Sequence, residues 1–244
     1  MGETLLIEKR FRGPPESGNG GYTCGAVASA IDAPAAEVTL RMPPPLQREL
    51  SLQGLDGGVE LRDGDSLIAE GRPLDGLDVE PPESVGLAEA AAAREASPLH
   101  EHHAWPMCFV CGPDRAPGDG MRVTCGVVEG RELVASPWET SNALPHEGGT
   151  LTAEMVWSAL DCPGGIAAMM LAEEPIVTAL GRLAARIDTL PRIGETYVAV
   201  GWPIDRDGRK HHTGSAIFSP EGELLACARA TWIELRGDML GART

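Results

Sequence analysis

In the second half of the chain, the spacing of apolar residues predicts one helix and several β-strands, which together form an antiparallel sheet around the helix. Over residues 151–160 the apolar positions are spaced by three, four and five, as on one face of a helix. We expect this helix to end near Asp161, because Pro163 disfavours helical geometry at the preceding residue. β-rich runs lie before and after it, and a Glu-Gly turn at 129–130 joins the first two. The predicted strands are 121–128, 131–139, 178–191, 195–204, 214–219 and 223–235.

The first half repeats this plan in a shorter form. A helix over 19–31 is followed by β-rich runs at 36–42, 48–53, 58–61 and 65–74. A pair of glycines stands at the predicted start of each helix, at 20–21 in the first half and at 148–149 in the second. The similarity is weak but collinear, and it favours an internal duplication.

A segment poor in large apolar side chains separates the two halves. Residues 76–103 are dominated by Pro, Ala and Glu, with one surface helix expected at 86–94. We therefore expect a reduced module over 1–75, a linker over 76–103 and a fuller module over 104–244. The smaller module is marginal as an independent core, so the two are expected to pack together.

Composition and charge argue against a nucleic-acid-binding protein and against a membrane-spanning protein. The 244 residues carry 20 Lys and Arg against 36 Asp and Glu, a formal charge of −16, and no concentrated basic patch offers a nucleic-acid site. We found no membrane-length apolar run and no export signal, so we expect a cytoplasmic protein whose six cysteines are reduced. The 30 glycines and 20 prolines indicate short elements and many turns.

Three motifs of the second half resemble the hotdog-fold thioesterase superfamily. They are LPRIGETYVAVGW, SPEGELLACARATW and CFVCGPDRAPGDGMRV, the last similar to a Cys-Phe-x-Cys-Gly-Pro motif in members related to phenylacetyl-CoA thioesterases. The resemblance covers nearly all of 104–236. In the first half, RFRGPPESGNGGYTCGAVASAI resembles the segment that opens the helix of the amino-terminal module in double-hotdog acyl-CoA thioesterases.

The resemblance implies an α+β double hotdog, with antiparallel sheets each wrapped around a central helix. The helix of one module and the sheet of the other would then line a cleft for an acyl thioester. The implied partner is acyl-CoA or an acyl-carrier protein, with no cofactor apart from the coenzyme A of the substrate. It also allows a homodimer of two double hotdogs.

Thioester hydrolysis needs donors for the developing oxyanion. Free amides at the start of a helix, such as those of Gly149 and Thr150, would supply them, and the absent Cβ of glycine lets a substrate approach. The alternative is that these glycines only turn the chain from strand to helix.

Hydrolysis also needs a carboxylate that attacks or activates water. The resemblance places this acid seven residues after the second glycine, where this chain has Val156. The nearest acids are Glu154 and Asp161, which share one stripe of the helix with Ser158. The alternatives are a first-turn acid favoured by the helix dipole for Glu154 and a helix cap for Asp161.

The remaining candidates are expected to bind rather than to react. The first helix carries no acid, so we assign Asn19, Gly21 and Tyr22 to substrate binding, although Asn19 also fits a helix cap. His146, before the second helix, joins them. The phosphates of coenzyme A, or an acidic carrier protein, would need local cations. The candidates are Arg182, Arg186, Arg209 and Lys210, with a solvated hairpin tip as the alternative for the last two.

Zinc binding is the main rival interpretation of one motif. His100, His102 and His103 precede a Cys108-x-x-Cys111 pair, and thiolates with imidazole suit tetrahedral zinc. No second close pair follows, however, and the spacing is not that of a zinc finger. We therefore expect no metal, and we interpret Cys162 as a buried structural thiol.

The sequence thus predicts a hydrolase of acyl-CoA or acyl-carrier thioesters in which water attacks a carbonyl polarised at a Gly-Gly helix start. A non-catalytic protein that binds acyl thioesters is the alternative, favoured by Val156 at the position of the acid. A dehydratase has little support, because no Asp and His occupy the early helix together.

Overall fold

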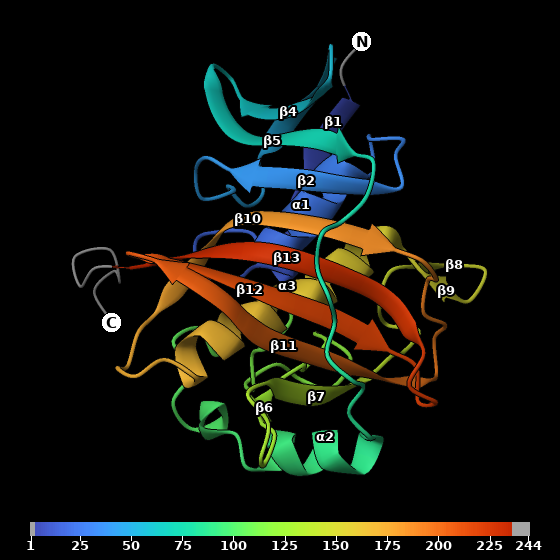
Figure 1. The fold of residues 1–244 in the computed structure, drawn as a ribbon. Coiled ribbons are helices and arrows are strands. Elements are labelled where there is room, and N and C mark those ends of the chain that lie inside the picture. Colours follow the sequence, from blue (N-terminus) through green and yellow to red (C-terminus); the bar gives the residue numbers. More distant parts are fainter. Residues whose placement is uncertain (1–2, 236–244) are drawn as a thin grey trace.

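The computed structural model describes residues 3–235, in which eleven strands form one antiparallel sheet (Figure 1). The strand order is β1-β3-β4-β5-β2-β10-β13-β12-β11-β7-β6. The first half contributes β1 (Glu3–Leu6), β2 (Ala35–Leu40), β3 (Glu49–Leu55), β4 (Gly58–Asp63) and β5 (Ser66–Leu74). The second contributes β6 (Gly126–Val127), β7 (Val134–Glu139), β10 (Thr178–Ile187), β11 (Thr196–Asp207), β12 (Lys210–Phe218) and β13 (Leu224–Glu234). A separate hairpin joins β8 (His146–Glu147) to β9 (Thr150–Leu151).

The two halves meet through one pair of strands, and their helices lie side by side behind the sheet in Figure 1. Strand β2 pairs antiparallel with β10, with Ala36 opposite Ala185. The helices are α1 (Gly20–Ala28), α2 (Leu87–Glu95) and α3 (Ala153–Met170), with short 3-10 turns at η1 (Lys9–Phe11) and η2 (Pro98–His100). None of the helices in the described part of the chain has the length and apolar character needed to cross a bilayer.

Glycines of α1 allow α1 and α3 to pack closely. A Cβ at Gly21 would overlap Cβ of Asp161 and lie 2.6 Å from the carbonyl oxygen of Trp157. One turn later, a Cβ at Gly25 would lie 2.8 Å from Cα of Glu154. Because position 21 meets the middle of α3 and position 25 meets its start, the helices run in opposite directions. The N-terminus of α1 therefore points at Asp161.

Helix α3 continues through Pro163, so the predicted end near Asp161 is wrong. Proline removes the amide that would bind the carbonyl of Ala159. Packing against the sheet outweighs this loss: Gly201 of β11 lets the Pro163 carbonyl approach, and the hydroxyl of Ser215 donates to the carbonyl of Leu160 at 2.5 Å. Local propensity marked a weak point in the helix, and tertiary contacts determined where the helix ends.

The Ser215 contact gives a first testable prediction. We expect Ser215→Ala to lower the free energy of unfolding by about 1 kcal/mol, because a buried hydrogen bond to α3 is lost. Urea unfolding followed by circular dichroism measures it, with the exposed Ser66→Ala as the control. Equal stability of both variants would show that the bond contributes nothing.

The predicted strand over 121–128 is mostly an ordered loop, and only β6 (Gly126–Val127) is a strand. Met121 and Val123 are buried, but their amides donate to the carbonyls of Phe109 and Val110 and not to a neighbouring strand. The apolar run therefore reflects burial beneath the 105–112 loop. Elsewhere the predicted strands and the start of α1 are confirmed within a few residues, while β1 and the β8–β9 hairpin were missed.

The segment predicted as a linker packs on the opposite face of the sheet from α1 and α3. It crosses this face after β5 and leads into α2, whose start agrees with the predicted surface helix within one residue (Figure 1). Val85, Ala90 and Ala93 are buried with Ala135 and Val198 of the sheet. The second half of the sheet is therefore covered on both faces.

Candidate functional site

Three residues predicted from sequence meet where the N-terminus of α1 touches α3. One oxygen of the Asp161 carboxylate, Oδ2, accepts hydrogen bonds from the backbone N–H of Gly21 at 2.8 Å and from Nδ2 of Asn19 at 2.9 Å. Asn19 is also the N-cap of α1, because its Oδ1 accepts from the amide of Tyr22 at 2.9 Å. Asn19 and Asp161 thus accept hydrogen bonds from two different amides at the start of α1.

The electrostatics of this junction favour a negative oxygen. The Gly21 amide and the positive end of the helix dipole are directed at the Asp161 carboxylate, and Gly21 has no Cβ to hold it away. Burial nevertheless raises the pKa of Asp161 to about 7, against the bonds from Gly21 and Asn19 that lower it. The side chain is only 2% exposed, and its Oδ1 has no hydrogen-bond partner among residues 3–235.

Three buried thiols lie beside this carboxylate. The sulfur atoms of Cys108, Cys111 and Cys162 all lie within 4.8 Å of one another, and the Nδ2 of Asn19 is 3.9 Å from the Cys108 sulfur. Hydrogen bonds from Cys111 and Cys162 lower the pKa of Cys108, whereas contacts with Cys108 and Cys111, together with burial, raise the pKa of Cys162. The sequence pointed to the first two cysteines but not to Cys162, because nothing links residues 54 positions apart before the chain folds.

Gly149 and Thr150 do not start the helix, so the predicted role of their amides is wrong. Gly148 and Gly149 both have positive φ and form the turn between β8 and β9. Helix α3 begins at Ala153, with Thr152 as its N-cap. The glycine pair makes a hairpin, because two residues in the left-handed region suit a tight antiparallel turn. Only the pair at 20–21 stands at a helix N-terminus.

The other predicted residues around the helices lie apart from Asp161 or have structural partners. Glu154 is half-buried at the first turn of α3, and the hydroxyl of Ser158 donates to its carbonyl at 2.6 Å. The ring of Tyr22 stacks on Phe11 at 4.0 Å, and burial, with Glu154 nearby, raises its pKa to about 12. His146 is exposed in the β8–β9 hairpin.

The predicted cations do not gather into one patch, and acidic side chains hold two of the four. Arg182 lies 3.7 Å from Glu37 on the neighbouring strand β2, and Arg186 pairs with Asp188. Arg209 donates to the backbone carbonyl of Glu234, while Lys210 lies beside it at the β11–β12 turn. This turn and β10 are separated by β13 in the sheet.

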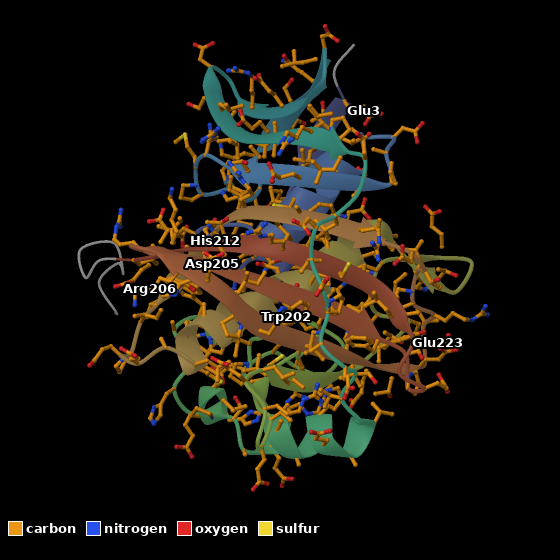
Figure 2. The ribbon with its side chains drawn as sticks, in the orientation of Figure 1. Glu3, Trp202, Asp205, Arg206, His212 and Glu223 are labelled. Atoms are coloured by element: carbon orange, nitrogen blue, oxygen red, sulfur yellow. The ribbon has the colours of Figure 1, made fainter. Side chains whose placement is uncertain are left out.

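A cavity of about 310 Å³ lies next to the C-terminal end of α3. Its lining includes Ala168, Arg206 and the buried residues His211 and Thr213. Asp205, Arg206 and His212 gather near it at the end of the β11–β12 hairpin, where His212 bonds to Asp205 (Figure 2). Asp161 is not part of this lining.

Comparison with known proteins gives matches in structure alone. No family model and no curated protein matches the sequence. A TesB protein of Mycobacterium avium subsp. paratuberculosis superposes with a TM-score of 0.59 at 13% identity, over 90% of this chain and 88% of that chain. A protein of Novosphingobium aromaticivorans with a provisional thioesterase assignment gives 0.61 at 12% identity, over 96% and 95%.

A third similar structure is described by its fold and not by an activity. A conserved protein of Alicyclobacillus acidocaldarius, described as having the hot dog fold, gives a TM-score of 0.54 at 10% identity, over 96% of this chain and 92% of that chain. These structural matches span both halves of the chain. At sequence identities of 10–13% they establish the fold and not the activity. The resemblance carried by the sequence motifs is thereby confirmed at the level of fold. The chain has the hotdog fold that these structures share.

Proposed function

We propose that the protein hydrolyses acyl thioesters of coenzyme A or of an acyl-carrier protein, as a double hotdog of modules 1–75 and 104–244 joined by 76–103. The observation that carries the proposal is the meeting of Asp161 with the amide end of α1. The helix-start amide left to polarise the carbonyl is then that of Gly20, in the first module, because the Gly21 and Tyr22 amides donate to Asp161 and Asn19. The acid comes from the second module.

The chemistry follows from what each group offers. A thioester carbonyl gains negative charge when water attacks it, and helix-start amides aimed at that oxygen stabilise the charge. Asp161 takes a proton from the attacking water and passes it to the leaving sulfur. Asn19 holds the carboxylate in place, so we assign it as a positioning residue. The thioester C–S bond breaks, giving a free acid and a thiol.

A substrate must reach the junction between Asp161 and the N-terminus of α1, and the surroundings of Gly20 suggest the route. This residue is half-buried, and its amide, the first of α1, has no acceptor among residues 3–235. The space that a Cβ would take at Gly20 is filled by the side chains of Leu180 and Leu40, both half-buried. These flexible apolar side chains suit an acyl chain. Because Asp161 is 2% exposed, the proposal requires this region to open when substrate binds.

Asp161→Asn tests the proposal without removing the contacts that hold α1. One oxygen accepts both hydrogen bonds, so asparagine keeps them and loses only the ability to take a proton. We expect hydrolysis of a panel of acyl-CoAs to fall by about a hundredfold. A thiol reagent follows the released coenzyme A, since all six cysteines of the chain are buried.

Two further variants make this test specific. The exposed Asp188→Asn should leave the rate unchanged. Glu154→Gln tests the other acid of α3, and a loss there with full activity in Asp161→Asn would reject the role of Asp161. If the wild-type protein is stabilised by acyl-CoA but releases no thiol, the non-catalytic alternative replaces hydrolysis. The burial of Asp161 is the observation that favours this alternative.

A further inference from the structure

We propose that Cys108, Cys111 and Cys162 bind one zinc ion. The inference is independent of the proposed hydrolysis, and it reverses the expectation that the chain holds no metal. That expectation rested on the lack of a second cysteine pair in the sequence. The fold supplies the missing ligand from α3, where Cys162 lies against the loop that carries the other two.

The spacing of the sulfur atoms matches what a zinc ion needs. A tetrahedral zinc with bonds of about 2.3 Å holds its thiolates about 3.8 Å apart. The Cys108 and Cys162 sulfurs lie 3.8 Å apart, and all three sulfurs lie within 4.8 Å of one another. These are also distances between unbonded sulfurs, because a disulfide bond is about 2.05 Å long.

The loop around the first two cysteines has the form of a metal-binding turn. The amide of Gly112 donates to the Cys108 carbonyl at 3.0 Å and closes the turn. A Cβ at Gly112 would lie 2.5 Å from the carbonyl oxygens of Cys108 and Pro106, so the turn depends on glycine.

The loop is held rigidly without the metal, as a preformed site requires. The buried guanidinium of Arg115 donates to the carbonyls of Met107 and Arg10 at 2.9 and 2.6 Å, and the amide of Phe109 donates to the carbonyl of Arg12 at 2.8 Å. These bonds tie the loop to the segment before α1. The third ligand stands on the longest helix of the fold, packed on both sides.

Among the described residues the cluster consists of the three sulfurs alone, and no carboxylate oxygen belongs to it, so Asp161 is not assigned as a ligand. The site is closed to solvent, since all three cysteines are buried, and closed thiolate sites are typical of structural zinc. The three histidines of the rival zinc interpretation do not belong to this cluster. His100 bonds to the carbonyl of Arg94, His102 is exposed, and Nδ1 of His103 accepts from the amide of Trp105 at 3.0 Å.

The experiment measures metal in the full-length protein. We expect about one zinc per chain by plasma mass spectrometry after purification under reducing conditions without chelator. Replacing zinc with cobalt should give the visible d–d and thiolate charge-transfer bands of a tetrahedral thiolate site. A metal-free protein that gives no such bands after anaerobic reconstitution with cobalt would overturn the proposal. So would a disulfide between any two of the three cysteines in the non-reduced protein.

Variants locate the ion. Cys162→Ser and Cys111→Ser should each lower the zinc content and weaken the charge-transfer bands. The matched controls are Cys24→Ser and Cys227→Ser, which replace buried thiols outside the cluster and should leave both readouts unchanged. Circular dichroism identifies any variant that fails to fold. If a variant is lost in this way, the zinc content and cobalt spectrum of the wild-type protein still test the proposal. Metal retained equally in Cys162→Ser and wild type would overturn it.

Discussion

Gly21→Ala is expected to lower the free energy of unfolding by about 3 kcal/mol, the upper end of the cost of overpacking a core. A Cβ at this position would overlap Cβ of Asp161 and lie 2.6 Å from the carbonyl oxygen of Trp157 and 3.0 Å from Cα of Ser158. Two of these atoms belong to the backbone of α3 and do not rotate away. Relief therefore requires α1 to move outward.

That movement also lengthens the hydrogen bond from the Gly21 amide to Asp161, so the packing and polar costs add. Urea unfolding measures the loss, and Gly54→Ala is the control. Gly54 is exposed on β3, has no atom within 4 Å of an added Cβ and no positive φ, so we expect a change within about 0.5 kcal/mol. If Gly21→Ala unfolds at the urea concentration of the wild type, the close crossing of α1 and α3 is not as described.

The close crossing shows which parts of the fold could be predicted from sequence. Periods of apolar residues gave the sheet and helix order, because burial of one face is a local property of each element. They did not give the end of α3, where Gly201 and Ser215 from distant strands hold the helix through Pro163. They also did not give β1, since no residue of Glu3–Leu6 is buried and its pattern carries no signal.

The candidate site also has a part that could be predicted from sequence and a part that could not. Asp161 could be predicted because acids are rare on the helix, and Asn19 and Gly21 because they start one. The sequence alone does not say that they touch, since Asn19 and Asp161 are 142 positions apart. The two glycine pairs look alike in sequence, and the difference between a hairpin turn and a helix start lies in φ angles set by the surrounding strands. This is why the sequence pointed to helix-start amides at 149–150, where the structure has a hairpin turn.

Asp161→Ala is expected to destabilise the protein by about 3 kcal/mol, whereas Asp161→Asn should stay within about 1 kcal/mol of the wild type. Alanine leaves the Gly21 amide and the Asn19 side-chain N–H buried without an acceptor, at about 1 to 3 kcal/mol for each donor. Removing a buried carboxylate offsets part of this cost. Asparagine keeps an oxygen for both donors and is neutral.

The comparison of the two variants separates support of the fold from chemistry. Both are unfolded in urea in the same reducing buffer, and both are assayed for thioester hydrolysis. If alanine and asparagine are equally stable, the two donors find other partners and Asp161 does not hold α1. If asparagine is stable but inactive while the wild type turns over, the carboxylate serves the reaction and not only the helix. An alanine variant alone would confuse these roles, because it loses the proton acceptor and the helix contact together.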